Sequence, residues 1–330
     1  MYTLKDIAIV ILNWNGKPLL EQFLPSVIAY SDQAAIYVAD NASTDDSVAL
    51  ISEKFPSVTL IQNVENGGYA KGYNEALKAI TEPLLCLLNS DIEVTEDWLQ
   101  PVLNEFNTDE NIAIVQPKIL DFKQKTHFEY AGAAGGFIDK YGYPYCRGRI
   151  FHTIEEDKGQ YNDSIPIFWA SGACFFIRSA VFKRLNGFDE TYFAHMEEID
   201  LCWRAFNANY TVKYVGASTV YHVGGATLSH TNPKKTYLNF RNSLLTLVKN
   251  TDKHVFIRTI LRMKLDGIAA LGFLLQLKPK YFFAILKAHA SFYRNLRRIL
   301  KLRQQLPKRS HYYKTKSIVW SYFIKKRKIF

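Results

Sequence analysis

The sequence lacks the marks of several protein classes. Its four cysteines stand far apart and form no CxxC pair, so neither a disulfide framework nor a zinc site is indicated, and a reducing cytosol is expected. The longest mostly apolar stretch of the C-terminal part, Leu265–Leu277, contains Asp266 and is too short to span a bilayer. The N-terminus shows no basic region followed by a long apolar run, so no signal peptide is expected.

Acidic residues are almost missing from the C-terminal part. Residues 231–330 hold 24 Lys and Arg against 2 Asp and Glu, a net charge of +22, whereas residues 1–230 carry −12. The whole chain is 48% hydrophobic and 22% charged, which excludes a disordered protein, and 330 residues suffice for one large or two ordinary domains. This asymmetry predicts an acidic globular body and a basic region that meets anions, either lipid or nucleic acid.

Polar side chains follow the apolar segments of the first 91 residues. Leu84–Leu88 is apolar throughout, as in a strand buried on both faces of a sheet, and Asn89, Ser90 and Asp91 follow it. Two earlier segments end in the same way: Ile7–Leu12 before Asn13 and Asn15, and Ala35–Ala39 before Asp40 and Asn41. Strands and helices alternate at short spacing here, which predicts a parallel sheet with right-handed crossovers. Ligands bind beyond the carboxyl ends of such strands, so we expect a ligand site at this edge.

The usual phosphate-binding loops are missing from that edge. The first strand-to-helix turn contains one glycine and no GxGxxG, and no Walker A sequence is present. The amide and carboxylate side chains at the strand ends suit a base and a ribose, with a metal ion left to hold the phosphates. Gly67 and Gly68 would let the backbone approach a ligand closely, although a plain turn explains them equally well.

The remaining part of the acidic body gives weaker signals. We expect a long loop region over 121–165, with at most a hairpin, as part of the substrate cleft. One buried strand is expected over 167–177, and its small residues either leave room for a ligand against Trp169 or allow a close strand crossing. Glu197, Glu198 and Asp200 open a helical segment in which Arg204 follows Asp200 at i+4. They form either a solvated acidic first turn with an ion pair or a catalytic group. A predicted strand over 211–215 leads to His222, which is either structural or functional.

Eight short motifs follow one another within residues 5–230: Asn13-Trp14-Asn15, Asp40-Asn41-Ala42-Ser43-Thr44-Asp45, Asn66-Gly67-Gly68-Tyr69-Ala70-Lys71-Gly72-Tyr73-Asn74, Leu88-Asn89-Ser90-Asp91, Ser171-Gly172-Ala173, Gly187-Phe188-Asp189-Glu190, Glu197-Glu198-Ile199-Asp200-Leu201-Cys202-Trp203-Arg204 and His222-Val223-Gly224-Gly225. In this order they resemble the family 2 glycosyltransferases, which are inverting enzymes with a GT-A fold. The resemblance is closest to the bacterial rhamnosyltransferase-like branch.

The resemblance implies a role for each site residue. Glu198 would be the general base, or share this role with Glu197. Asp91, at the second Asp of the family's DxD pattern, and His222 would bind Mn²⁺ or Mg²⁺. The nucleotide-binding set would be Asn13, Asn15, Asp40, Asn41, Ser43, Asn66, Gly67, Gly68, Gly72, Asn74, Asn89 and Ser90. The donor and acceptor cleft would contain Trp169, Gly172, Asp200 and Arg204.

Two positions depart from the family pattern. Asn89 replaces the first Asp of DxD and removes a charge, and Glu198 replaces the usual Asp with a side chain one methylene longer. These departures leave open a non-catalytic, membrane-docked nucleotide-sugar-binding protein of the same fold. A processive polysaccharide synthase is disfavoured because there are no membrane spans and no QxxRW sequence. A nucleotidyltransferase is disfavoured because no basic, glycine-rich loop follows the first strand.

The fold that the resemblance implies is α/β: a Rossmann-like, mostly parallel sheet with helices on both faces over residues 1–230. A basic amphipathic helical region, with helices to about Gln305, follows over 231–330. The implied enzyme is a metal-dependent hexosyl- or rhamnosyltransferase that moves a sugar from a UDP- or dTDP-sugar to a saccharide or polyprenyl-linked acceptor in bacterial surface polysaccharide synthesis. We expect it in the bacterial cytoplasm, peripheral on the inner face of the cytoplasmic membrane through the C-terminal region. Nucleic acid is the disfavoured partner, and a homodimer stays open.

Overall fold

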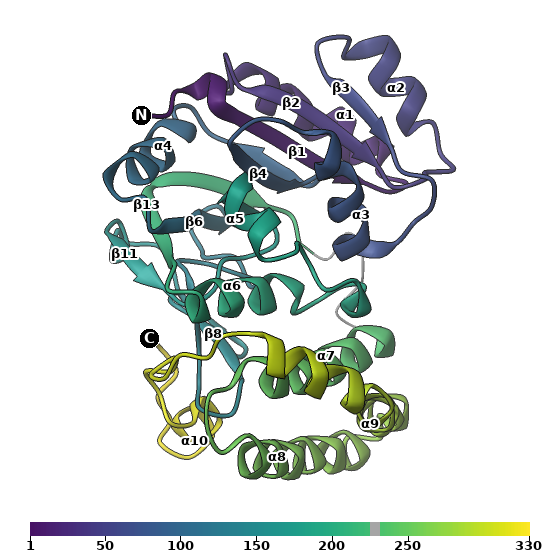
Figure 1. The fold of residues 1–330 in the computed structure, drawn as a ribbon, viewed down its shortest axis with the longest axis vertical. Coiled ribbons are helices and arrows are strands. Elements are labelled where there is room, and N and C mark those ends of the chain that lie inside the picture. Colours follow the sequence, from purple (N-terminus) through teal and green to yellow (C-terminus); the bar gives the residue numbers. More distant parts are fainter. Residues whose placement is uncertain (225–231) are drawn as a thin grey trace.

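The computed structural model describes residues 1–224 and 232–330, and a mixed β-sheet forms its centre (Figure 1). Four parallel strands make up one half of this sheet in the order β3-β2-β1-β4: β1 (Ile7–Asn13), β2 (Ala35–Asp40), β3 (Thr59–Gln62) and β4 (Leu84–Asn89). The helices that connect them are α1 (Lys17–Ala29), α2 (Ser47–Lys54) and α3 (Gly68–Ala76). The parallel arrangement predicted for this part of the sequence is confirmed.

The other half of the sheet is mixed. β12 (Cys174–Arg178) lies antiparallel between β4 and β6 (Ile112–Asp121), and β13 (Thr211–His222) runs parallel to β6. β11 (Ser164–Ile167) and β5 (Ile92–Val94) pair antiparallel with β13. The single strand predicted over 167–177 is therefore wrong. β11 ends at Ile167 because the backbone of Phe168 and Trp169 pairs with Gly136. Before β12 begins, the N–H of Ser171 donates to the Gln116 side chain (2.8 Å) and its hydroxyl accepts from the N–H of Ala173 (3.2 Å).

The two faces of the sheet are covered by different helices. Ile7, Ile9 and Ile11 of β1 pack with α1, α2 and α4 (Leu99–Thr108), whereas Ala8 and Val10 face the core that includes α3 and α6 (Glu197–Asn207). This alternation follows from the two-residue period of a strand buried on both sides. The expectation of helices on both faces is confirmed.

The stretch predicted as a long loop region contains more structure than expected. β7 (Gly136–Ile138), β8 (Pro144–Cys146), β9 (Arg149–Ile150) and β10 (Thr153–Ile154) form a small antiparallel sheet. Several of its side chains, among them Phe137, Tyr145 and Ile150, join the core on the α3 and α6 side of the main sheet. Burial of these side chains explains why so irregular a sequence is ordered. The short helix α5 (Ser179–Arg184) follows β12.

The basic C-terminal region is helical, as predicted. It contains α7 (Pro233–Asn250), α8 (Val255–Leu275), α9 (Pro279–Gln305) and α10 (Ile318–Phe323). In Figure 1, α7, α8 and α9 lie below the sheet, and α7 lies next to α6. Leu244 and Leu245 of α7 and Phe292 of α9 belong to the same core as α6. In the two described ranges, no helix has the length and apolar character needed to cross a bilayer.

Candidate active site

The ends of β1 and β2 meet at one edge of the sheet, where the sequence places the nucleotide. The buried Asn13 donates through Nδ2 to Asp40 Oδ1 (3.2 Å) and to the hydroxyl of Ser43 (3.2 Å). The other carboxylate oxygen of Asp40 accepts from the backbone N–H of Ser43 (2.9 Å), and Asn15 Oδ1 accepts from the N–H of Thr44 (2.7 Å). The structure thus brings Asn13, Asn15, Asp40 and Ser43 into one hydrogen-bonded cluster.

The next two predicted residues extend this cluster toward α3. Asn41, which is buried, donates through Nδ2 to Asn66 Oδ1 (3.0 Å) and to the carbonyl of Gly68 (3.1 Å). Asn66 Oδ1 also accepts from the N–H of Gly68 (3.0 Å). The loop before α3 is therefore fixed on the end of β2 by amide side chains.

Four other residues predicted to bind nucleotide also have close contacts within the protein: Gly67, Gly68, Gly72 and Asn74. Gly68 has φ +76°, and a Cβ there would lie 2.4 Å from the carbonyl oxygen of Phe193. Asn74 binds the backbone of Phe188 with both ends of its amide, each at 2.9 Å. A Cβ on Gly72 would lie 2.9 Å from Leu12, and one on Gly67 would meet the Lys71 side chain. These residues hold α3 against its neighbours.

At the end of β4, the predicted metal-binding residues face each other. Nε2 of His222, the last residue of β13, lies 3.2 Å from Asp91 Oδ1 and 3.4 Å from Asn89 Nδ2. Ser90 lies between Asn89 and Asp91 in the sequence. The side chains of Asp91 and His222 are both buried. A third group was missed by the sequence analysis: Glu129, whose Oε1 lies 3.4 Å from His222 Nδ1. Glu129 follows β6 in a stretch without periodicity, so nothing but its carboxylate could have marked it.

The charges of this cluster are strongly coupled. Burial acts to lower the pKa of His222, but the carboxylates of Glu129 and Asp91 outweigh it and raise the pKa to about 10. Burial acts in the opposite direction on Asp91, and the neighbouring His222 leaves the pKa of Asp91 below its ordinary value. Without a metal ion, the protonated side chain of His222 therefore balances the negative charges of Asp91 and Glu129.

The pair formed by Asp91 and His222 has the chemistry of a divalent-cation site. Neighbouring ligands of an octahedral ion lie about 3 Å apart, and the two facing atoms are 3.2 Å apart. Across residues 1–224 and 232–330, no three His, Cys, Asp or Glu side chains are arranged to hold an ion by themselves. Mg²⁺-type sites often take one or two protein ligands and complete their shell with substrate phosphates and water, so the pair fits such an ion.

Hydrogen bonds lead from this cluster to the N-terminus of α6. The N–H of Asn89 donates to the carbonyl of Ala173 (2.9 Å), and the hydroxyl of Tyr69 donates to the neighbouring carbonyl of Gly172 (2.8 Å). The N–H of Tyr69 in turn donates to the carbonyl of Phe193 (2.8 Å), four residues before α6. Gly172 therefore lies between the end of β4 and the segment that carries the predicted base.

Glu197 and Glu198 begin α6, and both have one shielded carboxylate oxygen. Oε2 of each is inaccessible to water and has no hydrogen-bond partner among the described residues. Burial raises the pKa of Glu198 to about 7, although backbone N–H groups at the start of α6 act against it. Burial and the neighbouring charge of Glu198 raise the pKa of Glu197 well above its ordinary value. Burial therefore disfavours the charged form of both carboxyl groups, and the pKa of Glu198 lies close to neutral pH.

The segment that leads into these glutamates has an uncommon backbone. Phe193, His195 and Met196 all have positive φ, at 64°, 68° and 75°, a conformation that costs side-chain-bearing residues on the order of 1–3 kcal/mol each. The fully buried Asn242 of α7 holds it: its Nδ2 donates to the carbonyls of Tyr192 (3.1 Å), Ala194 (3.0 Å) and His195 (2.7 Å).

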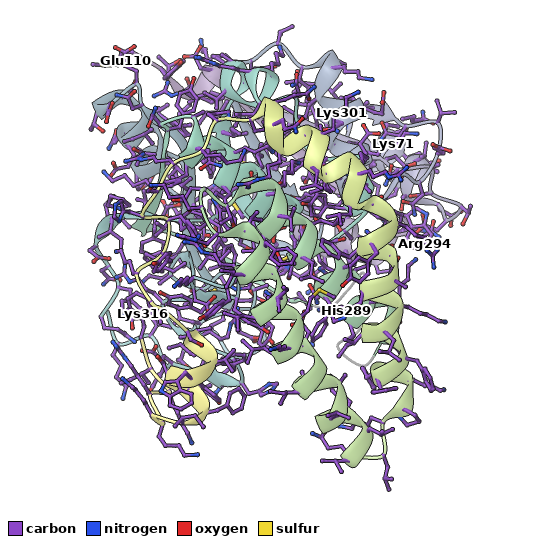
Figure 2. The ribbon with its side chains drawn as sticks, turned by 60° about the horizontal axis from the view of Figure 1, so that its bottom comes forward. Lys71, Glu110, His289, Arg294, Lys301 and Lys316 are labelled. Atoms are coloured by element: carbon purple, nitrogen blue, oxygen red, sulfur yellow. The ribbon has the colours of Figure 1, made fainter. Side chains whose placement is uncertain are left out.

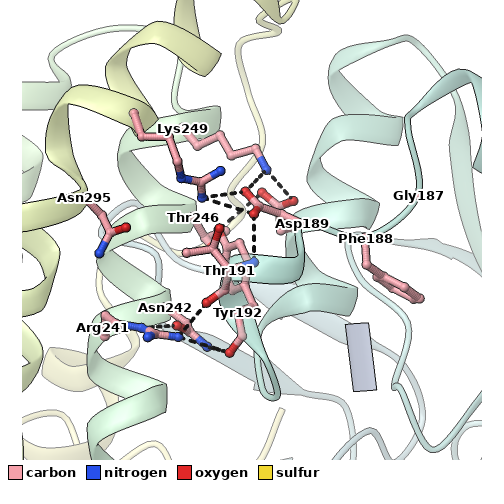
Figure 3. Close-up of polar contacts among 12 residues, drawn as sticks. Gly187, Phe188, Asp189, Thr191, Tyr192, Arg241, Asn242, Thr246, Lys249 and Asn295 are labelled. Atoms are coloured by element: carbon pink, nitrogen blue, oxygen red, sulfur yellow. Dashed lines mark hydrogen bonds and ion pairs between the residues drawn. The ribbon is translucent and has the colours of Figure 1, made fainter. Parts of the chain in front are cut away.

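Arg241 adds bonds to the carbonyls of Thr191 (2.9 Å) and Tyr192 (3.1 Å), and Figure 3 shows both side chains reaching from α7 to this segment. The sequence analysis missed these hydrogen bonds from Arg241 and Asn242. The spacing of Leu238, Asn242 and Leu245 could have indicated them, because it puts an amide on the apolar face of a helix.

Three predicted cleft residues, Asp200, Arg204 and Trp169, belong to the interior. Asp200 is fully buried and its Oδ2 accepts from Arg204 Nε (2.8 Å) and Lys249 Nζ (2.9 Å), while Oδ1 accepts from Asn250 (2.7 Å). Lys249 also binds Asp189 (2.9 Å; Figure 3). This corrects the expectation for Asp200 and Arg204: they join α6 to α7 behind the site and do not line a cleft. Trp169 is likewise buried, and its indole N–H donates to the carbonyl of Phe137 (2.8 Å).

Comparison with known proteins gives this arrangement a family. The model of glycosyl transferase family 2 matches residues 8–185, which is more than half of the chain and includes β1 to β4 and β12. The protein belongs to glycosyl transferase family 2. The match ends before α6, so it covers Asp91 but not Glu198 or His222.

A curated relative of this glycosyltransferase is the N-acetylglucosaminyl-diphospho-decaprenol L-rhamnosyltransferase of Mycobacterium tuberculosis. The two are 25% identical over 235 residues, which cover 66% of this chain and 75% of the relative. The similarity extends the family match to about two thirds of the chain.

Solved structures show the same fold. GalNAc-T7 with UDP, GalNAc and Mn²⁺ aligns with a TM-score of 0.58 and 16% identity over 74% of this glycosyltransferase, which spans about half (48%) of that chain. A mannosyltransferase from Pyrobaculum calidifontis in complex with GDP-Man and Mn²⁺ aligns with a TM-score of 0.55 and 14% identity over 87% of both chains. At this identity the likeness concerns the fold alone, and it confirms the predicted GT-A fold.

Proposed function

We propose that this glycosyltransferase is a metal-dependent inverting enzyme that moves a hexosyl or rhamnosyl residue from a UDP- or dTDP-sugar to a saccharide or lipid-linked acceptor in bacterial surface polysaccharide synthesis. The observation that carries the proposal is a pair of acidic centres joined by hydrogen bonds through Gly172 and Tyr69. Asp91 faces His222 at the end of β4, and Glu198, with a pKa of about 7, begins α6. The name of the mycobacterial relative, which gives it a diphospho-decaprenol acceptor, supports the lipid-linked alternative.

The donor nucleoside would bind at the ends of β1 and β2. Asp40 and Asn13 would contact the nucleoside, with Asn15, Asn41, Ser43 and Asn66 holding the surrounding loops in place through the hydrogen bonds described above. Because Asn13 Oδ1 is buried without a hydrogen-bond partner in the described part of the chain, it is an acceptor still open to a ligand.

Asp91 and His222 would hold the divalent cation, with Asn89 and Ser90 beside them. A bound Mn²⁺ or Mg²⁺ would neutralise charge that develops on the leaving nucleoside diphosphate. A solved fold neighbour that contains GDP-Man and Mn²⁺ supports this choice of ion. Asn89 suits the site because its amide lies beside His222 without adding a third negative charge to the two carboxylates already there.

Glu198 would act as the general base. It would remove the proton of an acceptor hydroxyl, whose oxygen attacks the anomeric carbon on the face opposite the diphosphate. One displacement of this kind inverts the configuration and needs no covalent intermediate. A general base works best when its pKa lies near the operating pH, and the pKa of about 7 for Glu198 meets this condition.

Residues 1–230 would carry this chemistry, and residues 231–330 would both brace it and bring it to the membrane. Asn242 would keep the strained segment before Glu198 in its active conformation, and Lys249 would fix α6 through Asp200. The net charge of +22 on the C-terminal region suits the anionic inner face of a bacterial membrane, where a polyprenyl-linked acceptor is found.

A donor assay tests the proposal. The purified protein is incubated with UDP-, dTDP- and GDP-sugars, each with and without Mn²⁺, and release of the nucleoside diphosphate is measured in the presence of polyprenyl-linked and free saccharide acceptors. We expect one donor class to be consumed, and only with the metal. Glu198→Gln should lower this turnover by about 10²–10⁴-fold, the range for loss of a general base, whereas the exposed Glu53→Gln control should match wild type.

Each contrary outcome has a distinct meaning. Wild-type turnover by Glu198→Gln would remove Glu198 as the base, and a large loss with Glu197→Gln instead would transfer the role to its neighbour. Metal-dependent nucleotide binding without any transfer would favour the non-catalytic binding protein.

A further inference from the structure

We infer that one face of α8, together with the turn between α8 and α9, inserts into an anionic lipid bilayer. The face consists of Ile257, Ile260, Leu261, Ile268, Leu271 and Leu275, all of them exposed, and is named here the α8 outer face. These positions recur at three, four and seven residues, so they share one side of the helix along five turns. Lys264 is the charged residue within this stripe.

α8 and α9 form a helical hairpin, and the turn between them is its most exposed apolar part. Leu275 and Leu277 are 86% and 89% exposed, and Lys278 and Lys280 follow them directly. The rings of Phe273 and Tyr281 stack at 5.1 Å and hold the two helices together beside this turn. Figure 2 shows α8 and α9 side by side, with their joined ends projecting beyond the rest of the molecule. A projecting tip can enter a surface that the body of the protein only touches.

Charge decides which occupant covers this face. The region from residue 231 onward has two acidic residues, Asp252 and Asp266, and both are largely buried in ion pairs with Arg258 and Arg262. Its exposed charges are therefore basic. A second copy of the same chain would bring like charge to like charge, whereas anionic lipid headgroups offer the complementary sign.

A regular row of basic side chains on α9 also favours an anionic bilayer as the partner of the α8 outer face. Lys280, Lys287, Arg294 and Lys301 are all exposed and stand seven residues apart, nearly two helical turns, so they form one row along the helix; Figure 2 labels two of them, Arg294 and Lys301. Exposed apolar side chains of α9, Phe283 and Leu286 among them, lie on the same helix. A helix with an apolar stripe and a Lys- and Arg-rich stripe lies in the membrane interface.

The docked hairpin would also place the active site. α7 packs against both α8 and α9 and contacts α6, whose first turn carries Glu198. A bilayer that holds α8 thus holds the proposed base at a fixed height above the lipid. The inference rests on the proposed function in one respect, namely that a lipid-linked acceptor gives the enzyme a reason to meet a bilayer.

Vesicle sedimentation with the full-length protein tests the inference. The variant Ile268→Glu/Leu271→Glu/Leu275→Glu changes three exposed side chains of the α8 outer face. A matched control places the same three charges at Tyr30, Val64 and Ile154, which are exposed apolar residues outside the C-terminal helices. Vesicles contain equal parts of phosphatidylglycerol and phosphatidylcholine, or phosphatidylcholine alone. We expect wild type and control to bind the anionic vesicles, and the α8 variant to bind at least about tenfold more weakly.

Three results would overturn the inference: equal binding by the α8 variant, equal loss in the control, or a wild-type dimer that the α8 variant dissociates without losing its vesicle binding. The last would assign the face to a second copy. Mn²⁺-dependent nucleotide binding is measured on the same samples and should be unchanged by the α8 variant, which also shows that it is folded. Absence of nucleotide binding in wild type would refute the proposed function and leave the vesicle result standing.

Discussion

The hydrogen bonds from Asn242 of α7 to the segment that precedes Glu198 lead to a specific prediction for Asn242→Ala. The substitution removes the two N–H groups of one fully buried amide, which are shared among the carbonyls of Tyr192, Ala194 and His195. It also removes the amide oxygen that accepts from Arg241 Nε (2.8 Å). A buried hydrogen bond contributes about 1 kcal/mol, so the loss of two donated bonds and one accepted bond is about 3 kcal/mol. The released segment contains the positive-φ residues His195 and Met196 and can relax toward ordinary backbone conformations.

This free energy sets the expected kinetic effect. If all of it shifts the segment away from its active conformation, the active fraction falls by about 150-fold, because about 1.4 kcal/mol corresponds to a factor of ten. Part of the loss will appear as lower global stability, so we expect kcat to fall by about 10- to 100-fold. The affinity for nucleotide should be unchanged, because the donor cluster at Asn13 and Asp40 does not touch Asn242.

The assay compares kcat, the KM for donor and the midpoint of thermal unfolding. Asn295→Ala is the matched control, because Asn295 makes a single local hydrogen bond to Ser291 on α9 (2.8 Å). A purely structural role would lower the unfolding midpoint and leave the kcat of the folded protein intact. That result, or an equal loss of kcat in Asn295→Ala, would refute the reasoning.

Three further predictions follow from the site and its supports. Transfer should rise with pH through about 7 and fall tenfold per unit below it, because burial raises the pKa of Glu198 to that value and a base acts only when ionised; a pH–rate profile without this limb contradicts the assignment. Asp91→Ala should abolish stabilisation of the nucleotide complex by Mn²⁺, as measured by calorimetry, while the exposed Asp32→Ala changes nothing. Lys249→Ala should lower the free energy of unfolding, measured by urea denaturation, by about 3–5 kcal/mol, because two buried carboxylates, Asp189 and Asp200, lose an ion-pair partner. A loss below about 1 kcal/mol would mean that the ion-pair network is not needed for stability.

Much of the fold could be read from the sequence because its signals are local. The apolar runs at Ile7–Leu12, Ala35–Ala39 and Leu84–Leu88 end at polar residues, and the corresponding strands β1, β2 and β4 end within a residue of the predicted bounds. Parallel strands bring their carboxyl ends to one edge, so the meeting of Asn13 with Asp40 followed from topology. Helices are predicted to about Gln305 from the alternation of basic and apolar residues, and α9 ends at that residue.

What the sequence could not give depends on contacts between distant segments. Glu129 reaches His222 across more than 90 residues from a stretch without periodicity, and no local pattern announces such a contact. Asp200 and Arg204 have the spacing of a surface ion pair, and contacts with segments outside α6, namely Lys249 of α7 and the carbonyl of Gly187, make them interior. Gly68 lies against the carbonyl of Phe193, more than 120 residues away in the sequence, and no local pattern announces this contact either.

The most direct test of the central claim is nucleotide binding by the purified protein, measured as the shift of the unfolding midpoint with UDP, dTDP, GDP and CDP, each with and without Mn²⁺. A ligand that binds the native state raises the midpoint by mass action. We predict that at least one of the four stabilises wild type, that it does so only with Mn²⁺, and that His222→Ala loses the metal-dependent part. Stabilisation that is the same with and without Mn²⁺, or no stabilisation by any nucleoside diphosphate, would contradict a metal-dependent donor site at Asp91 and His222.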